Sequence, residues 1–482
     1  MSDARAQPIH VLPIAAALVV ACAVALSSGG SGDALATVVA FATGAILLPF
    51  APTLVAVFVV LLLGLPYQLN EVPATFAGVN LYFADAILFF FAAAAGFEAA
   101  RRILGRPYPE RTMGERFMVV LVWASAAYGV FALARGMLVS GFEWRDAIGA
   151  YRRYCYYPLA FLVPLILPIQ RRHVPLVQLA LAVGAMCIVF AALYSLANGL
   201  TYRPDLFVVR ATEPDPRLLG YTACMTLAMG LALFVAMTMQ PGRIVLRAAA
   251  AAGAIACTGA LLISGWRLSV GLALAMPFAA ISVMSLLRGG RAMTQLATLC
   301  IGAMLVAAAI AVTAFALPGT WQRATLRFEQ RAREFDVTDD SRYYSWKNAA
   351  ADWSKSPILG AGLGRQSQFF TRGSEGTLTW VSMSTHNKFL GLLAEGGALG
   401  LVPVVAFEAS FLVLIFRRRR DLAAAYRPLV TGIVVGYLAV TGFSFLQPMQ
   451  VSAIVSMHLL MGFAILLCRP EFREVRPAFG DP

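Results

Sequence analysis

The stretch STHNKFLGLLAEGG, residues 384–397, places a histidine, an asparagine, a lysine and a glutamate beside a run of leucines. His386 is one of only four histidines in the chain and lies at the boundary between polar and apolar sequence. Ser384 and Thr385 are residue types that cap helices, so a helix is expected to begin near Asn387. The helix dipole disfavours an imidazolium at this end and keeps the ring neutral. The pattern therefore predicts a general base at His386.

The remaining histidines and the nearby glutamate are weaker candidates for catalysis. His458 lies inside an apolar run, where a hydrogen-bonded core residue is the simplest interpretation. Glu395 follows His386 by nine residues, about 180° around a helix, so the two do not share a face. A buried pairing, or a helix break at the glycine pair that follows, is the favoured role of Glu395.

A set of arginines falls where orientation rules do not expect positive charge. Short arginine-rich loops face the cytoplasm, yet arginines also occur in the segments that alternate with those loops. A guanidinium group binds phosphate through two parallel hydrogen bonds and needs no metal ion. These outward arginines therefore suit a ligand with phosphates at headgroup depth; ion pairing to lipid headgroups or loop acids is the alternative for each of them. In short loops or at span ends they are Arg145, Arg152, Arg153, Arg203, Arg210, Arg217 and Arg267.

The longest outward segment, about 318–386, adds further arginines and two expected helices. Arg323, Arg327 and Arg331 are spaced i, i+4 and i+8, one face of a helix that lies on headgroups or substrate, or is simply solvated. The sequence TDDSRYYSWKNAAADW, which contains Arg342, begins with capping residues and predicts a second helix that ends before Pro357.

A string of alternating glycines follows that second helix. In SPILGAGLGRQSQFF the glycines are Gly360, Gly362 and Gly364. A dinucleotide fingerprint would need a preceding strand and a βαβ unit, and neither is predicted here. The string therefore predicts a tight turn that brings the backbone close to another part of the chain.

The composition requires a membrane to hold these elements. The chain has 482 residues, of which 60% are hydrophobic and 13% charged, and its mean hydropathy is +0.74. A soluble domain carries about a quarter charged residues, so the chain is predicted to be an all-α polytopic membrane protein. Its seven cysteines are scattered singly, which favours neither a disulfide framework nor a zinc site.

The apolar runs and the breakers between them predict about fourteen membrane helices (a range of about 12–14), each of about 20 residues or slightly fewer. An uncleaved first span is favoured over a signal peptide. With a cytoplasmic N-terminus, the arginine clusters at 101–116, 171–172, 243–247, 288–291, 417–420 and 469–476 all fall on the cytoplasmic side. The expected spans lie near 11–28, 35–50, 52–66, 84–100, 117–138, 156–169, 175–197, 218–239, 244–263, 267–287, 294–316, 398–416, 428–446 and 449–467.

This topology divides the chain into four expected parts. They are an N-terminal transmembrane bundle (1–317), a long periplasmic loop with amphipathic helices (318–386), C-terminal transmembrane helices (387–468) and a cytoplasmic tail (469–482).

Three of these stretches resemble the signature of the O-antigen ligase and polymerase superfamily. The sequence SRYYSWKNAAADWSKSPILGAGLGRQSQFF…STHNKFLGLLAEGGALGLV is similar to its helix with Arg and Trp, its glycine turn and its HN…E.G motif. Upstream, VVRATEPDPRLLGYTACMTLAMGLAL and LLISGWRLSVGLALAM resemble its arginine-containing segments. The likeness covers about 203–405, and the flanking spans match only as hydrophobic segments.

The resemblance implies glycosyl transfer by a GT-C-like enzyme on the periplasmic face of the bacterial inner membrane. The donor is a glycan on undecaprenyl diphosphate, and the acceptor is another glycan or lipid A-core. By resemblance Arg210 and Arg267 hold the donor diphosphate and His386 acts at the acceptor hydroxyl. Arg342, Asn387, Lys388, Arg323 and Arg327 are further expected contacts to substrate or acceptor. A chain-length regulator is an expected partner, the lipid bilayer is the surroundings, and nucleic acid is not expected.

Two features of the sequence bear on the mechanism implied. No D-x-D-like pair occurs in the early outward loop, so a metal-independent, inverting transfer without cofactors is expected. The loop RATEPDPRLLG departs from the family pattern, because Arg217 follows Pro216 where Pro-Asn is more usual after the acidic residue. The division of labour between Arg210 and Arg217 is therefore open. About fourteen spans, more than a lipid A-core ligase is expected to have, favour a polymerase slightly.

Two other functions are weighed against glycosyl transfer. A lipid-linked oligosaccharide flippase or other polysaccharide transporter would place charges within its spans and between internal repeats, whereas the charges here concentrate at outward span ends and in one long segment. A membrane protease would need a Ser/His dyad or an H-E-x-x-H motif within spans, and neither is present.

Overall fold

The computed structural model describes most of the chain between the two termini. The residues described are 47, 50–64, 74–76, 79–103, 111–198, 200–201, 209–210, 219–264, 267–289, 307, 341–372, 378–383, 385, 387–445 and 451–473. The expected span at 11–28 and the expected helix that carries Arg323, Arg327 and Arg331 lie outside this part of the chain, as do nearly all of the expected spans at 35–50 and 294–316.

The described part is mostly helical. The N-terminal half contains α3 (Ala51–Gly64), α5 (Phe83–Ile103), α6 (Met113–Leu138), α7 (Trp144–Tyr151), α8 (Leu162–Ile166) and α9 (Val174–Ala197). The C-terminal half contains α10 (Tyr221–Thr238), α11 (Ile244–Ile263), α12 (Arg267–Arg288), α15 (Ser341–Lys355), α16 (Lys388–Arg417), α17 (Arg427–Ser444) and α18 (Val451–Leu466). Short 3-10 helices of three residues each lie between these helices or after them: η5 (Arg171–His173), η6 (Ala424–Tyr426) and η7 (Pro470–Phe472).

Among the described residues, six helices are long and apolar enough to cross a membrane, and three shorter apolar helices accompany them. The six are Met113–Leu138, Arg171–Ala197, Ile244–Ile263, Ser269–Arg288, Lys388–Arg417 and Ala424–Ser444. The outer faces of these helices are apolar: on α6, for example, Phe117, Val120, Trp123 and Phe131 are exposed. A soluble protein rarely exposes a patch of this kind, so the chain is a multi-pass membrane protein. The count of about fourteen spans stays a prediction.

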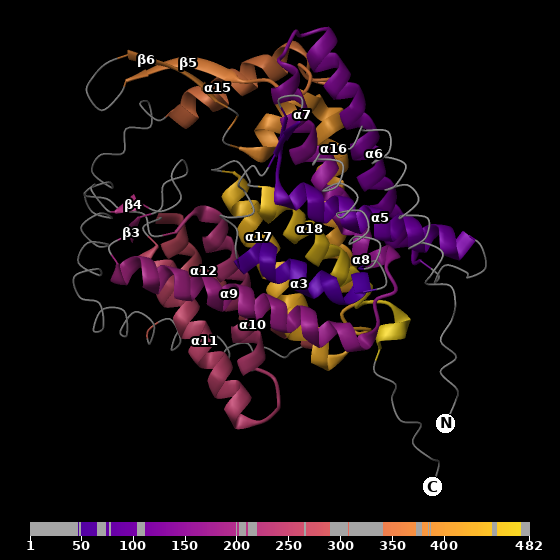
Figure 1. Cartoon of the computed structure of the whole chain (residues 1–482), viewed down its shortest axis with the longest axis vertical. Helices are drawn as coiled ribbons and strands as arrows, with labels where there is room; N and C mark the ends of the chain where they lie inside the picture. Colours follow the sequence, from indigo (N-terminus) through magenta and orange to yellow (C-terminus); the bar gives the residue numbers. More distant parts are fainter. Residues whose placement is uncertain are drawn as a thin grey trace, which may run out of the picture.

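The helix α10 lies at the centre of the bundle. It is buried along nearly its whole length and packs against α9, α11, α12 and α17. The helix α18 is likewise buried and packs against α3 and α8, and α16 packs against α6 (Figure 1). These contacts join helices far apart in the sequence into one hydrophobic core.

Two expectations about secondary structure are corrected by the structure. The expectation of an all-α fold misses three two-stranded antiparallel sheets within the described residues: β1–β2 (Ala74–Phe76 and Val79–Leu81), β3–β4 (Leu200–Thr201 and Val209–Arg210) and β5–β6 (Ser367–Arg372 and Leu378–Met383). The expected span at 156–169 is not one helix but a π-helix η3 (Arg152–Tyr156), a 3-10 helix η4 (Tyr157–Phe161) and the short α8. Pro158 and Pro164 each lack the N–H that a regular helix would use.

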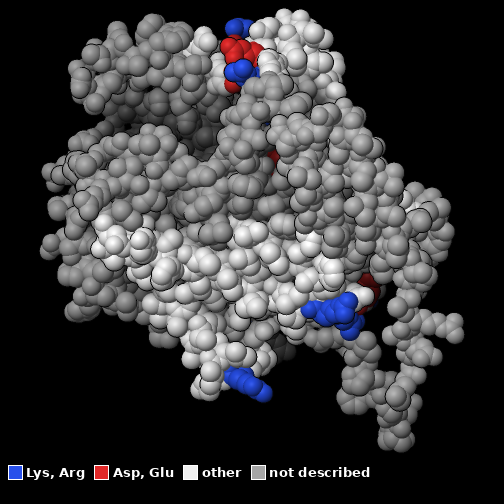
Figure 2. All heavy atoms as spheres, in the orientation of Figure 1, with Lys and Arg blue, Asp and Glu red and all other residues white. Residues whose placement is uncertain are grey.

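Polar structure gathers at two opposite ends of the bundle. At the top of Figure 1, α7, α15 and the β5–β6 hairpin lie near the upper end of α6 and above α12, α17 and α18. At the other end, Gln240 in the turn between α10 and α11 donates to the carbonyl of Ala424 over 2.7 Å, and the segments around Arg171, Asp421 and Arg469 contact one another. There Arg171 donates to the carbonyl of Glu471 over 2.9 Å, and Arg473 pairs with Asp421 over 3.0 Å. On the face drawn in Figure 2, the charged side chains of the described residues lie mainly toward these two ends, and the described residues drawn between them are mostly uncharged.

The described members of the arginine clusters predicted to be cytoplasmic therefore gather at one end of the bundle, where Arg171, Arg469 and Arg473 contact neighbouring segments. The strongest link there is a buried ion pair in which the guanidinium of Arg469 donates to Oε1 of Glu115 through Nε (2.9 Å) and Nη2 (2.5 Å). A second link is Arg288, whose Nη2 donates to the carbonyl of Met239 over 2.8 Å.

Candidate active site

The glycine string forms a tight turn between three helices. Gly360, Gly362 and Gly364 have φ angles of 69°, 100° and 102°, a region that side chains disfavour. A Cβ atom on Gly362 would lie 2.4 Å from the backbone of Gly136 in α6, and one on Gly364 would lie 2.6 Å from the backbone nitrogen of Ala147 in α7. The predicted close approach of the backbone is therefore present, and its neighbours are α6, α7 and α16.

The helix α16 is broken where this turn meets it. Gly397 has φ 61° and ψ −163°, which interrupts the helix. The carbonyls of Ala394 and Glu395, just before the break, accept hydrogen bonds from the backbone N–H groups of Ala361 (2.9 Å) and Gly362 (2.8 Å). The glycine turn thus donates hydrogen bonds to two carbonyls that, in a continuous helix, would accept them from N–H groups of the same helix.

Glu395 is both buried with a hydrogen-bond partner and adjacent to the helix break, the two roles that the sequence suggests for it. Its side chain is buried, and its Oε2 accepts a hydrogen bond from the backbone N–H of Gly364 over 3.0 Å. Arg153 and Arg365 lie near enough to interact with this carboxylate electrostatically. Glu395 therefore holds the glycine turn against α16.

Asn387, and not Ser384 or Thr385, is the N-cap of α16. Its Oδ1 accepts a hydrogen bond from the backbone N–H of Leu390 over 2.9 Å, and the helix begins at Lys388. Thr385 is buried, and its hydroxyl faces Nη1 of Arg365 at 3.5 Å. The predicted helix start near Asn387 is confirmed. The N-cap is Asn387 itself, and not Ser384 or Thr385 as the sequence suggested.

Lys388 turns from this start into the bundle. Its ammonium pairs with Oε1 of Glu408 in α16, and the hydroxyl of Tyr437 in α17 donates to Oε2 of the same carboxylate over 3.1 Å. Charged groups inside a membrane bundle are costly and usually functional. Sequence reasoning missed Glu408, although a lone carboxylate within an apolar run was the available signal.

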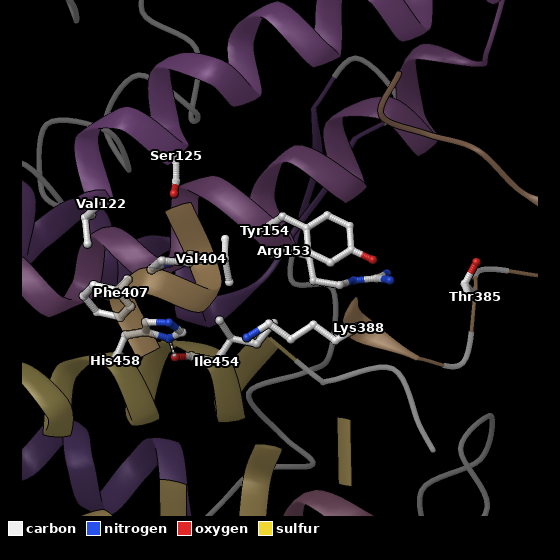
Figure 3. Close-up of a pocket in the computed structure, with 11 residues that line it drawn as sticks. Val122, Ser125, Arg153, Tyr154, Thr385, Lys388, Val404, Phe407, Ile454 and His458 are labelled. Atoms are coloured by element: carbon white, nitrogen blue, oxygen red, sulfur yellow. Dashed lines mark hydrogen bonds between the residues drawn. The ribbon is translucent and has the colours of Figure 1, made fainter. Parts of the chain in front are cut away.

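A narrow cavity of about 30 Å³ lies between α6, η3, α16 and α18. In Figure 3, Arg153, Tyr154 and Thr385 lie on one side of it, Phe407 and His458 on the other, and the ammonium of Lys388 reaches in between. Tyr154 is fully buried. Burial, reinforced by the nearby Glu395 carboxylate, raises the pKa of its hydroxyl, which therefore stays protonated as a hydrogen-bond donor.

His458 is a hydrogen-bonded core residue, as its position in an apolar run predicts. Its Nδ1 contacts the carbonyl of Ile454 at 2.7 Å, and its ring stacks on Phe407 with the ring centroids 6.0 Å apart. It nevertheless lines the cavity that Lys388 enters.

Two neighbouring outward arginines have different surroundings. Arg152 forms an ion pair with Asp85 and lies over the rings of Tyr82 (5.1 Å) and Tyr157 (5.6 Å). The acid that pairs with Arg152 is Asp85 in the first turn of α5. Arg153 instead lines the cavity.

The other predicted site residues are described in part or not at all. Arg210 lies in β4, Arg267 begins α12 and Arg342 is the second residue of α15; only their backbone is described. His386, Arg217, Arg323 and Arg327 fall outside the described residues. Among the predicted residues, the structure therefore places the side chains of Asn387 and Lys388, and Lys388 lies near Arg153, Tyr154 and Thr385.

A buried arginine that the sequence interpretation missed lies directly after the glycine string. The Nε atom of Arg365 is 2.5 Å from Oδ2 of Asp352, and its Nη1 donates to Oγ of Ser367 over 2.9 Å. Burial opposes ionisation of Asp352. The hydrogen bonds and charges of Lys355 and Arg365 outweigh this, so the pKa of Asp352 is lowered below its ordinary value.

Residues 252–405, about a third of the chain, match the family model described as O-antigen ligase. A comparison with curated proteins gave no match. The matched residues contain Arg267, the glycine turn and His386, the motifs that carry the resemblance seen in the sequence. The match confirms, for this segment, the resemblance to the O-antigen ligase and polymerase superfamily.

Proposed function

We propose that the protein is a membrane glycosyltransferase of the O-antigen ligase or polymerase type. It transfers a glycan from an undecaprenyl-diphosphate-linked donor to a sugar hydroxyl of a second glycan or of lipid A-core. The reaction takes place on the periplasmic face of the bacterial inner membrane, needs no metal ion and inverts the anomeric centre. The observation that carries the proposal is the match of residues 252–405 to the O-antigen ligase family.

The proposed chemistry is a single displacement. The acceptor oxygen forms a bond to the anomeric carbon of the donor sugar while the bond from that carbon to the phosphate oxygen breaks. His386 takes the proton of the acceptor hydroxyl, a contribution of roughly 10²–10⁴-fold for general base catalysis. Arg210 and Arg267 bind the diphosphate and stabilise the negative charge that develops as undecaprenyl diphosphate leaves.

The surroundings of the start of α16 support this assignment. Thr385 and Lys388, on either side of position 386 in the sequence, line the same cavity as Arg153 and Tyr154. A general base needs fixed neighbours and restricted water, and a buried hydroxyl beside two cations offers both.

One observation favours the second candidate function, a transporter of lipid-linked glycans. The pair Lys388–Glu408 with Tyr437 is a charged group inside the bundle, the kind of feature that a transporter would use. The assay of function must therefore measure transfer and translocation separately.

The proposal is tested with the purified protein in lipid vesicles, supplied with a lipid-linked glycan donor and an acceptor glycan. We expect transfer that persists in EDTA. His386→Ala should lose transfer by roughly 10²–10⁴-fold and still bind the donor. Arg210→Ala and Arg267→Ala should weaken donor binding itself. Arg243→Ala is the matched control, because Arg243 is exposed and lies at the opposite end of the bundle.

Three outcomes would contradict the proposal. Wild-type turnover in His386→Ala would contradict the assignment of His386 as general base. Loss of transfer in EDTA would contradict a metal-independent mechanism. Translocation of the donor without transfer would favour the transporter. Deletion of the gene separates the two transferases: a ligase leaves lipid-linked polymer unattached to lipid A-core, whereas a polymerase leaves single repeat units.

A further inference from the structure

A hollow of about 560 Å³ lies on the surface of the protein where α16 ends. Its apolar wall consists of Leu412, Val413 and Phe416. Its arginine wall consists of Arg417, Arg419 and Arg420. The arginine wall follows the apolar wall directly in the sequence, so the hollow changes from apolar to cationic along the end of the helix.

The apolar wall continues the face that α16 turns toward the membrane. Leu399, Val402 and Val413 are 48%, 61% and 49% exposed, and their spacing places them on one side of the helix. Arg417, one turn after Val413, is the last residue of α16 and of its candidate span. The hollow therefore lies where the hydrocarbon of a membrane gives way to headgroups, the depth that arginine side chains reach at the end of a span.

The arginine wall has no acidic partner among the residues that the structure describes. Arg418, the member of the arginine run that does not line the hollow, pairs with Asp421 over 3.3 Å. Asp421 also pairs with Arg473, over 3.0 Å, so this carboxylate does not neutralise the arginine wall. The C-terminus of a helix carries a partial charge of only about −0.5, which three further arginines exceed.

A ligand that contacts both walls must have an anionic head and an apolar body. Guanidinium groups bind phosphate oxygens through paired hydrogen bonds, and basic pockets beside membrane helices suit anionic lipid headgroups. A free phosphate would leave the apolar wall without a contact, and an acidic protein segment would have to enter a surface that faces hydrocarbon. The volume is within the range of about 300–1,000 Å³ that is usual for small-molecule sites.

We propose that the hollow at the end of α16 binds an anionic glycerophospholipid from the leaflet at the arginine-rich end of the bundle. The phosphate lies against the arginine wall, and an acyl chain follows the apolar wall toward the middle of the membrane. The hollow shares no lining residue with the cavity that Lys388 enters, so lipid binding here does not depend on the proposed transfer reaction.

The test uses the full-length protein, freed of lipid in a neutral detergent, and native mass spectrometry to count the molecules that rebind. Phosphatidylglycerol, phosphatidylcholine and inorganic phosphate are the probes. We expect one phosphatidylglycerol to bind at a concentration at which neither of the other two is retained. Equal affinity for phosphatidylcholine overturns the need for an anionic head, and equal affinity for inorganic phosphate overturns the need for the apolar wall. These comparisons use the wild type alone, so they do not depend on the folding of a variant.

The double variant Arg417→Gln/Arg420→Gln then tests the arginine wall itself. One arginine near a membrane surface changes the affinity for an anionic lipid by roughly 5-fold, so we expect the double variant to lose roughly 25-fold in affinity for phosphatidylglycerol. The matched control is Arg172→Gln/Arg243→Gln, which removes two exposed arginines from the same end of the bundle that do not line the hollow. It should bind phosphatidylglycerol as the wild type does. Wild-type affinity in Arg417→Gln/Arg420→Gln, or an equal loss in the control, overturns the proposed site.

Discussion

At the scale of single residues, Arg152 and Arg153 show how far a charge pattern can be interpreted. Both break the orientation rule for arginine in the sequence, and a phosphate ligand would explain either. The structure separates them: Asp85 neutralises Arg152, whereas Arg153 lines the cavity beside Tyr154. Asp85 is distant in the sequence, so no local pattern could reveal which of the two arginines pairs with it.

The ion pair of Asp352 with Arg365 predicts a pH dependence of stability. Because the pKa of Asp352 is lowered in the folded protein, the pair stabilises the outer segment fully above the unfolded-state pKa of about 3.9. This contribution is lost as the pH falls through the lower, folded-state pKa. The difference in thermal unfolding temperature between wild type and Asp352→Asn should therefore be the same at pH 7 and pH 5 and shrink below pH 4. A difference that is unchanged at the lowest pH would contradict the assignment of charge.

At the scale of elements, the sequence predicts the helices and turns that are specified by local residues, and it misses features that depend on contacts between distant residues. The helix α15, the helix start near Asn387 and the glycine turn follow from caps and glycine spacing. The hairpin β5–β6 is missed, although SQFFTR and LTWVSM, rich in aromatic and β-branched residues around a glycine-containing loop, are typical of a hairpin. Arg365 and Glu408 are missed because only tertiary contacts distinguish them from other charged residues.

The glycine turn should not tolerate side chains. Gly362→Ala places a Cβ atom 2.4 Å from the backbone of Gly136 at a φ of 100°, so we expect a loss of about 1–3 kcal/mol in unfolding free energy and loss of transfer. Gly149→Ala is the control, because a Cβ atom there meets nothing within 4 Å inside α7. Chemical denaturation in detergent measures both variants. Equal stability of the two would mean that the turn is not packed as described.

At the scale of the whole molecule, the segment that carries α15 and the β5–β6 hairpin (the outer segment) and the arginine-rich segments around Arg171 and Arg469 lie at opposite ends of an apolar bundle. The buried pair Glu115–Arg469 joins the start of α6 to the residues after α18, although the two are 354 positions apart in the sequence. The alternation of arginine clusters along the sequence predicts such a common end, because a chain that crosses a membrane repeatedly returns its alternate loops to one side.

The orientation of these two ends can be measured directly. In right-side-out membrane vesicles, Lys355→Cys should react with a membrane-impermeant maleimide, because Lys355 is exposed at the end of α15. Arg420→Cys, exposed after α16, should react only after permeabilisation. Wild-type protein gives the background from native cysteines. The opposite pattern would place the outer segment in the cytosol, beyond the reach of any periplasmic carrier.

The interruption of α16 at Gly397 limits how this protein can be recombined with its relatives. The carbonyls before the interruption accept hydrogen bonds from the backbone of the glycine turn. The region 341–383 is therefore not structurally independent of α16, although the sequence predicts that the long loop ends at residue 386. A chimera that exchanges this region alone would have to reproduce the close backbone contacts of the glycine turn with α6, α7 and α16. A chimera that keeps these backbone contacts would therefore have to exchange the region together with residues 113–151 and 388–405.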